Sequence, residues 1–411
     1  MTHTFSNLIA LLLLAAVPHV VQGADWPQRR GIRNDGISPE TNWVHAWPKE
    51  GPPIRWKASV GTGFSSITVA QGSAYTMGNT SEVDSVFCLN TEDGSIRWKF
   101  SYDEPLAPTM YEGGPNSTPT IDSTAMYVSS RSGKVFRLDA RSGKEVWRRN
   151  LEEYVGQKNG KWGVGGSPLV VGSRLYINYG AAVVALDAAS GQPIWQSARE
   201  PKSETSFNTP VFADIDGAKV LFALMNEALF AVSADDGKLF WRHGYGSGYK
   251  THCSDVVVTP EGVFISSGDD GGELLALERS KPKSLWKNKN LSTFTGSPVL
   301  VGGHLFGVNA AGYKKGKQEL RCIELTKGEV KWALPEFGQD SLIAAGDRLL
   351  VLKERGELLV IRATPERGEI LARAQVLGGK CWTQPALSGG LLYCRNAKGQ
   401  VVCVDLRPAK T

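Results

Sequence analysis

The chain has 411 residues, of which 41% are hydrophobic and 21% charged, a composition typical of folded globular proteins and not of disordered ones. Its 46 Lys and Arg residues outnumber 41 Asp and Glu, and the resulting net charge of +5 is spread along the chain. Nucleic-acid-binding proteins usually concentrate basic charge in a patch or tail, so we expect no nucleic-acid partner.

The first 23 residues have the pattern of a secretory signal peptide. The run 8–17 is almost wholly apolar, and it is shorter than the roughly 20 residues that span a bilayer. Val21 and Gly23 suit a signal peptidase, so we place cleavage after Gly23; a membrane anchor is the alternative. We expect an exported protein, periplasmic or extracellular, with no transmembrane segment in the mature chain. With no Cys beside the cleavage site, we expect no lipoprotein.

An extension over residues 24–53 precedes a repeat that fills residues 54–408. Six units place a Trp eight positions after an acidic or polar residue, and successive Trp lie 49, 48, 46, 45 and 46 residues apart. A Gly stands four residues before the Trp in five of the six units. Each unit opens with Ser/Thr-Pro or a similar step and continues with apolar runs of strand length. A repeat of this length predicts one four-stranded unit per period.

Two further units lack part of the pattern. Residues 341–372 carry Ala372 in place of the Trp, and residues 384–405 supply only three strands before the repeat ends. The missing fourth strand stands at the other end of the repeat, where Trp56 lies 42 residues before Trp98. We therefore expect an all-β, eight-bladed β-propeller of four-stranded blades whose ring is closed by the N-terminal strand.

The repeated Trp residues are expected to be structural. An indole offers a large flat surface to the neighbouring blade and an N–H that can bond a backbone carbonyl. The Gly permits a positive φ in the preceding turn. We assign this docking role, and no sugar-binding role, to Trp56, Trp98, Trp147, Trp195, Trp241, Trp286 and Trp332.

Residues 138–147 and 186–195 both read Leu-Asp-x-x-Ser-Gly-x-x-x-Trp. This pattern resembles the tryptophan-docking repeat of the pyrroloquinoline-quinone-like (BamB-like) propellers, and the resemblance covers about residues 54–406. That family includes quinoprotein alcohol dehydrogenases and the BamB component of outer-membrane protein assembly. The opening Trp26–Gly31 resembles secreted bacterial members. The chain has neither the adjacent Cys pair of many of the dehydrogenases nor the lipobox Cys of many BamB proteins, so no catalytic residue transfers by motif.

The loops that join successive units are expected to meet on one face. Residues 101–116 and 148–166 are the longest, and 250–255 and 380–384 share their face. His252 is the best titratable candidate there, and Asp255 could orient it or bind a cation. The alternative is that the polar groups only satisfy the solvated mouth of the channel. The candidate ligand- or partner-binding residues are Asn116, Trp162, Asn208, Lys250, His252, Asp255, Asp340 and Trp382.

Two functions follow from this pattern. The first is an exported, monomeric propeller that binds a protein or small-molecule partner through its loop face, as an assembly scaffold does. The alternative is a quinone-dependent dehydrogenase of an alcohol or sugar, with PQQ and calcium as cofactors. No metal site is assigned, because Asp214-x-Asp216-Gly217 lacks the other ligands of a calcium loop and favours a turn. Cys88, Cys322 and Cys403 are expected to be small buried residues; disulfide pairing is left open.

Overall fold

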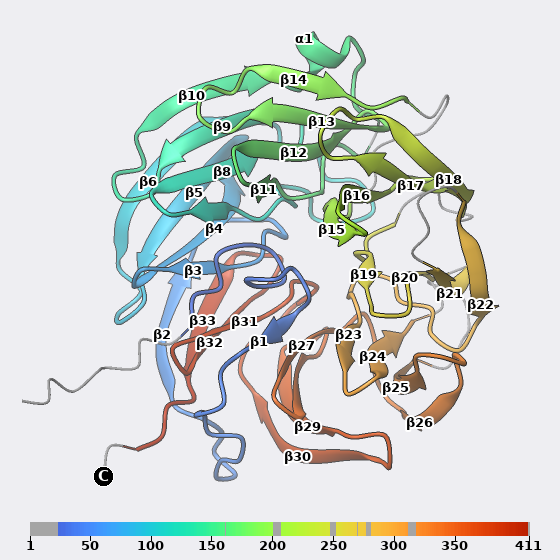
Figure 1. Cartoon of the computed structure of the whole chain (residues 1–411). Helices are drawn as coiled ribbons and strands as arrows, with labels where there is room; N and C mark the ends of the chain where they lie inside the picture. The colour runs from blue at the N-terminus through green and yellow to red at the C-terminus, as the bar shows by residue number, and fades with distance from the viewer. Residues whose placement is uncertain are drawn as a thin grey trace, which may run out of the picture.

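Eight antiparallel sheets stand around one axis in the computed structural model (Figure 1). The prediction of an all-β, eight-bladed propeller with four-stranded blades is therefore confirmed. The predicted signal peptide, residues 1–23, lies outside the described residues. The structure describes residues 24–160, 162–199, 207–246, 252–268, 270–276, 281–310 and 318–409.

The first four blades follow in chain order. Blade 1 comprises β3 (Thr68–Ala70), β4 (Ser73–Thr80), β5 (Val83–Asn90) and β6 (Ile96–Asp103). Blade 2 comprises β7 (Thr120–Asp122), β8 (Ala125–Ser129), β9 (Lys134–Asp139) and β10 (Glu145–Asn150). Blade 3 comprises β11 (Leu169–Val171), β12 (Arg174–Tyr179), β13 (Ala182–Asp187) and β14 (Pro193–Gln196). Blade 4 comprises β15 (Val211–Ile215), β16 (Ala218–Leu224), β17 (Ala228–Ser233) and β18 (Leu239–Gly244).

The other four blades complete the ring. Blade 5 comprises β19 (Val257–Val258), β20 (Val263–Ser267), β21 (Gly271–Ala276) and β22 (Lys283–Asn288). Blade 6 comprises β23 (Val299–Val301), β24 (His304–Asn309), β25 (Glu319–Glu324) and β26 (Val330–Leu334). Blade 7 comprises β27 (Ser341–Ala345), β28 (Arg348–Leu352), β29 (Glu357–Ala363) and β30 (Gly368–Gln375). Blade 8 comprises β31 (Ala386–Ser388), β32 (Leu391–Arg395), β33 (Gln400–Asp405) and β2 (Ile54–Ser59).

The N-terminal strand closes the ring as predicted. β2 pairs antiparallel with β33, and Trp56 lies opposite Cys403. The fully buried guanidinium of Arg395 joins the last blade to the first, because it donates to the carbonyl oxygens of Ser65 (2.9 Å) and Met77 (2.6 Å). The edge of β33, which would otherwise be unpaired at the end of the repeat, is therefore covered by β2.

The path of each blade explains its sequence pattern. The first strands of neighbouring blades contact one another around the axis, so they line the inside of the ring. The second strand β8 is buried throughout, whereas the fourth strand β6 alternates between exposed residues and half-buried or buried ones. In each blade the register shifts just before the Trp position, as between Glu145 and Trp147. Such a bulge re-aims the next side chain, here toward the neighbouring blade.

In blades that keep the full pattern, such as blade 3, the turn before the fourth strand is built by Asp, Ser and Gly. Asp187 Oδ1 accepts hydrogen bonds from the backbone N (2.8 Å) and Oγ (2.6 Å) of Ser190. Gly191 has a φ of 70°, a conformation that costs glycine little. A Cβ added to Gly191 would lie 2.7 Å from the ring of Trp147, so the glycine also makes room for the indole of the preceding blade.

The same contact recurs around the ring. The indole of each preceding blade lies against Gly94, Gly143, Gly191, Gly237, Gly328 and Gly368. Five indole N–H groups donate to a backbone carbonyl of the next blade at 2.7–3.2 Å: those of Trp56, Trp98, Trp147, Trp286 and Trp332. Trp195 differs, because its Nε1 is buried without a hydrogen-bond partner in the described part of the chain.

The extension compensates for the missing Trp of blade 7. Trp43 belongs to the hydrophobic cluster between blades 7 and 8, and Trp47 packs against the same cluster as Ala372 does. The Nε1 of Trp47 donates to the carbonyl oxygen of Arg373 at 3.0 Å. An indole therefore reaches this blade from residues 24–53 and not from its own fourth strand.

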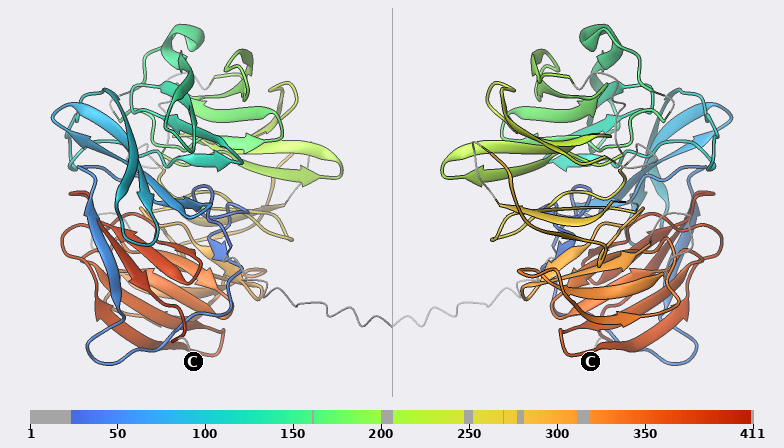
Figure 2. Two further views of the ribbon diagram at one scale, coloured as in Figure 1. Left: turned by 90° about the vertical axis from the view of Figure 1, so that its left-hand side faces the viewer. Right: turned by 90° about the vertical axis from the view of Figure 1, so that its right-hand side faces the viewer.

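One connection differs from its predicted form, and one predicted turn is confirmed. The loop predicted over 148–166 is shorter, since β10 continues to Asn150 and is followed by α1 (Leu151–Val155) at the outer edge of the ring (Figure 2). The run 214–217 is the turn between β15 and β16, in which Gly217 N donates to Asp214 Oδ1 at 2.9 Å. All six cysteines are free, and Cys88, Cys322 and Cys403 are buried as predicted. No helix in the described ranges is long and apolar enough to cross a membrane.

Candidate functional site

The opening residues of six units form a continuous series of hydrogen bonds around the inside of the ring of first strands. The backbone N of each opening residue donates to the side chain of the equivalent residue in the next blade, at 2.8–3.1 Å, from blade 1 to blade 6. The residues in this chain are Ser66, Thr118, Ser167, Thr209, Asp255 and Ser297. Asp255 takes the place of a hydroxyl residue in blade 5, which gives the ring one carboxylate.

The N-terminal segment 24–40 crosses the axis inside this ring (Figure 1). Trp26 forms an isolated bridge with Val69 of blade 1, and β1 (Ile37–Ser38) adds to blade 7 as a parallel fifth strand beside β27. Arg30, which is 1% exposed, donates through Nη2 to Pro298 O of blade 6 at 2.8 Å. Glu40 then accepts a hydrogen bond from Gly390 N at 2.7 Å. The extension therefore occupies the channel that the first strands surround.

One ion pair fixes the tip of this segment. The Nε of Arg29 lies 2.9 Å from Oδ2 of Asp255, and the side chains are 15% and 0% exposed. Asp255 Oδ1 also accepts from Thr209 N at 2.9 Å, and Ser297 Oγ lies 3.2 Å from Oδ2. Asp255 thus joins blades 4, 5 and 6 to the N-terminal segment.

A pocket of about 170 Å³ lies above Arg29, on the face formed by the links between blades, here called the loop face. The links of seven of the eight blade junctions contribute to it, and Arg29 is the only charged residue among the described residues that line it. The residues of this mouth pocket are Arg29, Phe64, Met110, Tyr111, Asn116, Trp162, Gly165, Phe207, Cys253, Phe294, Thr295 and Trp382.

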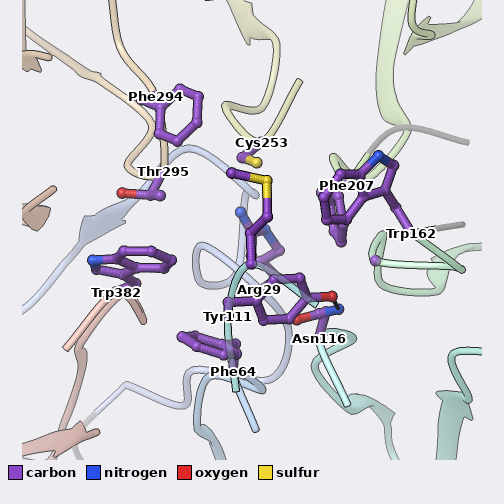
Figure 3. Close-up of a pocket in the computed structure, with 12 residues that line it drawn as sticks. Arg29, Phe64, Tyr111, Asn116, Trp162, Phe207, Cys253, Phe294, Thr295 and Trp382 are labelled. Carbon is purple, nitrogen blue, oxygen red and sulfur yellow. Dashed lines mark hydrogen bonds between the residues drawn. The ribbon is translucent and has the colours of Figure 1, made fainter. Parts of the chain in front are cut away.

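Aromatic rings surround much of the mouth pocket, and Figure 3 shows Trp382, Phe64 and Tyr111 on one side and Phe207 and Trp162 on the other. The ring centroids of Trp382 and Phe64 are 5.7 Å apart, and those of Phe64 and Tyr111 are 5.4 Å apart. Tyr111 stacks on Trp162 at 6.3 Å. These separations are within the range of favourable aromatic pairs, so each ring supports its neighbour.

Trp382 is also held from outside the mouth pocket. Its Nε1 donates to Glu354 Oε1 at 3.0 Å, and Lys380 Nζ lies 4.3 Å from its ring centroid. Lys380 in turn pairs with Glu112 at 2.9 Å. The wall at Trp382 is therefore preorganised before any ligand arrives.

The structure brings some of the predicted residues together and buries others. Asn116, Trp162 and Trp382 line the mouth pocket. Lys250 lies outside the described residues. The remaining four are buried below the mouth pocket with exposures of 0–2%: Asn208, His252, Asp255 and Asp340.

Asp255 does not orient His252, because it is held by Arg29 and by the ring. His252 Nε2 lies 3.2 Å from the carbonyl oxygen of Asn226, and its ring packs 5.4 Å from that of Tyr245. Burial lowers the pKa of His252 to about 4, so the imidazole is neutral at pH 7. It offers no exposed charge to a ligand.

The other buried groups likewise have structural partners. Asn208 Nδ2 donates to Leu224 O at 2.8 Å. Burial raises the pKa of Asp340 to about 6, although the backbone N of Gly338 (2.8 Å) and of Glu354 (2.6 Å) donate to its carboxylate. Burial also raises the pKa of the Cys253 thiol, partly opposed by Arg29. A thiol held in its neutral form is a poor nucleophile. Cys253 therefore contributes only apolar surface to the lining of the mouth pocket.

Several lining residues were missed from the sequence, although a repeat position marks some of them. Phe64, Phe207 and Thr295 all stand two residues before the Ser or Thr that opens a blade, the place that the predicted Asn116 also holds. Aligning the units on that opening residue would have found them. Met110, Tyr111 and Phe294 come from links of irregular length, and Arg29 comes from outside the repeat.

A quinone cofactor with calcium does not fit these side chains. Calcium takes six to eight oxygen ligands, largely from carboxylates and carbonyls. Within the part of the chain that the structure describes, the lining of the mouth pocket contains no carboxylate, and the nearby Asp255 already binds Arg29, a backbone N–H and a hydroxyl. Among the described residues, no three His, Cys, Asp or Glu side chains are grouped as a metal would require.

Comparisons with known proteins agree with the architecture. The family model described as outer membrane protein assembly factor BamB matches residues 109–334, more than half of the chain. The outer membrane protein assembly factor BamB of Moranella endobia is 24% identical over 60% of this chain, and the chain spans about 63% of that relative's length.

Two solved structures have the same fold. The crystal structure of BamB from Moraxella catarrhalis covers 86% of this chain and 99% of its own, with a TM-score of 0.61 and 17% identity. A quinohemoprotein alcohol dehydrogenase from Comamonas testosteroni covers 94% of this chain and 81% of its own, with a TM-score of 0.67 and 15% identity. At these identities the likeness is one of fold alone.

Proposed function

We propose that this chain, which belongs to the family of the outer membrane protein assembly factor BamB, is an exported scaffold that binds a protein partner through its loop face. The observation that carries the proposal is the mouth pocket, in which Phe64, Tyr111 and Trp382 form a preorganised apolar wall. Loops held by a rigid framework are the usual place for recognition.

The partner proposed is a protein that takes part in outer-membrane protein assembly, by analogy with the names of the relatives. The N-terminal segment lies across the axis beneath the mouth pocket, so a partner contacts a concave surface with a floor. Met110, at its rim, is 67% exposed. Methionine adapts to varied apolar surfaces, and aromatic anchors in pockets supply much of the affinity of protein interfaces. The partner would insert one apolar side chain here.

Binding to an unfolded outer-membrane barrel protein tests this proposal. The chain from residue 24 onward is titrated into a fluorescently labelled barrel protein diluted from urea, and anisotropy reports binding. Trp382→Ala should weaken the interaction about tenfold or more, because truncating a central aromatic anchor costs at least 1–2 kcal/mol. Ser173→Ala, in the β11–β12 turn on the opposite face, is the control. Equal affinities for the two variants would refute the role of the mouth pocket.

Export is part of the same proposal. Residues 1–23 would direct the chain out of the cytoplasm, and cleavage after Gly23 would free Ala24. Expression of the full chain in a Gram-negative host, followed by fractionation and N-terminal sequencing, checks this. A mature form that begins at residue 24 in the periplasmic fraction is expected; retention of an intact N-terminus in the cytoplasm would contradict it.

The dehydrogenase alternative has no observation of its own beyond the shared fold. Among the described residues, the lining of the mouth pocket contains no carboxylate that could act as a general base or neutralise a calcium ion. We therefore propose binding without catalysis.

A further inference from the structure

A small polar cavity lies beside the floor of the mouth pocket. Its volume is about 30 Å³, and it shares Arg29, Phe64, Thr295 and Trp382 with the larger space. Its other lining residues are mostly hydroxyl or amide groups: Ser66, Gly296, Ser297, Ser341, Leu342, Thr383 and Gln384. A water molecule needs about 10–15 Å³, so the cavity has room for one small polar group. The two spaces form an apolar outer chamber and a polar inner chamber.

Arg29 has hydrogen-bond donors that its own structure does not use. A guanidinium carries five N–H donors. The Nε of Arg29 donates to Asp255, and the two terminal nitrogens have no hydrogen-bond partner within the described ranges. The residue lines both chambers. Two parallel N–H groups of this kind bind a carboxylate in a bidentate manner.

Ser66 supplies a second unused donor. It is 5% exposed, and its backbone N donates to Thr118 Oγ1 at 3.1 Å. Its own Oγ is buried and makes no hydrogen bond in the part of the chain that the structure describes. The equivalent hydroxyls of Thr118, Ser167 and Thr209 each accept a backbone N–H from the preceding blade. Ser66 is thus an exception in the ring, and it lies in the wall of the inner chamber.

The charges around the floor favour an anion. Arg30 lies next to Arg29, is fully buried and donates to carbonyl oxygens only. Asp35, which faces Arg30, pairs with Arg33, and Asp255 pairs with Arg29. The buried Arg30 therefore has no carboxylate partner of its own, and its Nη1 makes no hydrogen bond within the described residues. An unpaired buried charge is costly, so a ligand with a single negative charge is stabilised beside Arg29 and Arg30.

We propose that the two chambers bind a monocarboxylate that carries an aromatic or branched aliphatic group. The carboxylate lies between Arg29 and Ser66 in the inner chamber. The apolar group lies among Phe64, Tyr111 and Trp382 in the outer one. Either a free organic acid or the C-terminal residue of a protein chain has this chemistry. The chain-end source rests on the proposed function, whereas the carboxylate site itself does not.

Matched ligands test the chemistry. N-acetyl-L-phenylalanine has a carboxylate where its amide has an uncharged carboxamide. N-acetylglycine keeps the carboxylate but lacks the benzyl side chain. Titration calorimetry, or ligand-observed NMR for weak binding, should rank the acid at least tenfold above the amide and above N-acetylglycine. Equal affinities of acid and amide would overturn the proposal.

Three variants locate the carboxylate. Arg29→Gln should weaken binding of the acid about 10- to 100-fold, the usual effect of losing hydrogen bonds to a charged group. Arg29 also anchors the N-terminal segment, so two milder variants are added. Arg29→Lys keeps the positive charge but removes the two parallel N–H donors. Ser66→Ala removes a hydroxyl that makes no other hydrogen bond. Both should weaken the acid about three- to tenfold and leave the amide unchanged. Unchanged affinity for the acid in these two variants would refute the assignment.

A peptide that ends in Phe shows whether the carboxylate ligand is a free organic acid or the C-terminal residue of a protein chain. If the peptide with a free C-terminus binds at least as well as the free acid, and its amidated form does not, the ligand is a chain end. If only the free acid binds, the ligand is a small molecule, and the carboxylate site stands without the chain end. If the barrel protein binds but no acid does, this proposal fails while the proposed function survives.

Discussion

The guanidinium of Arg29 and the carboxylate of Asp255, 226 residues apart in the chain, meet at 2.9 Å in the centre of the propeller. Asp255 occupies the position that Ser or Thr holds in most other blades, where it still accepts the backbone N–H of Thr209. Asp255 therefore continues the series of hydrogen bonds between the first strands, and it also fixes the segment that lies across the axis. The floor of the mouth pocket depends on this pair.

Asp255→Thr should separate these two roles. Threonine restores the hydroxyl of the other blades, so the bond from Thr209 N is kept while Arg29 loses its partner. Breaking a buried ion pair by removing one member costs about 3–5 kcal/mol, and we expect a loss of that order in the free energy of unfolding. Limited proteolysis should then cut within residues 24–40, which the wild type protects.

Arg33→Ala is the matched control for that experiment. Arg33 pairs with Asp35 on the same segment, but its side chain is 57% exposed. Exposed pairs contribute about 0–1 kcal/mol, so this variant should melt close to the wild type. Equal destabilisation by the two substitutions would contradict the special role of Asp255.

The indole contacts between blades predict a difference between two Trp→Phe substitutions. Trp286 Nε1 donates to Leu325 O at 2.7 Å, whereas Trp195 Nε1 has no partner in the described residues. Trp286→Phe leaves that carbonyl unsatisfied and should cost about 1–3 kcal/mol more than Trp195→Phe. Trp195→Ala should still cost about 3–5 kcal/mol through lost packing. Denaturant melts measure all three. A near-unchanged stability of Trp195→Ala would refute the docking role.

Burial of His252 predicts a loss of stability in acid. Its pKa is about 4 in the folded protein and about 6.5 when unfolded. Between these values the unfolded chain binds more protons, so stability is present above pH 6.5 and is lost as the pH falls toward 4. Relative to His252→Gln, the wild type should lose roughly 2–4 kcal/mol between pH 7 and pH 4.

Two buried acids act in the opposite direction. Burial raises the pKa of Asp84 to about 7 and that of Asp340 to about 6, so their contributions weaken stability as the pH rises from about 4. They cancel in the comparison, because wild type and variant both contain them. A flat difference between wild type and His252→Gln would show that His252 is not buried as described.

The described residues that line the mouth pocket include no carboxylate, so we expect that quinone and calcium do not stabilise the chain. Thermal melts with pyrroloquinoline quinone and calcium chloride, together and separately, should agree with the ligand-free melt within about 1 °C. A dye-linked assay with simple alcohols should give no turnover. A saturable rise in melting temperature that requires both additions would revive the dehydrogenase alternative.

The ring could be predicted because it repeats. Eight copies of one pattern locate each strand even where Ala372 replaces the Trp, and the displaced Trp56 shows how the ring closes. The N-terminal segment could not be predicted in this way, since Arg29 and Arg30 occur once and their partners lie more than 200 residues away. Only the closing of the ring brings those partners to one point.

The site was predicted less well than the fold. Trp162 and Trp382 were identified as aromatic residues in the links of the loop face, and they do line the mouth pocket. His252 and Asp255 were paired on sequence spacing, but residues three apart in extended chain need not face one another. Asp255 could have been interpreted correctly, because it stands where neighbouring units have Ser or Thr. Phe64 and Phe207 required an alignment of the units on that same position.

Photo-crosslinking at Met110 and Ser173 tests the central claim most directly. Met110 lies at the rim of the mouth pocket, and Ser173 lies in an exposed turn on the opposite face. A photoreactive amino acid is placed at either position in the full chain, expressed in a Gram-negative host, irradiated in living cells and analysed by mass spectrometry. We predict that position 110 yields adducts with an outer-membrane protein or a component of its assembly, and that position 173 yields none. Adducts at position 173 with none at position 110 would contradict the assignment of the loop face as the binding surface.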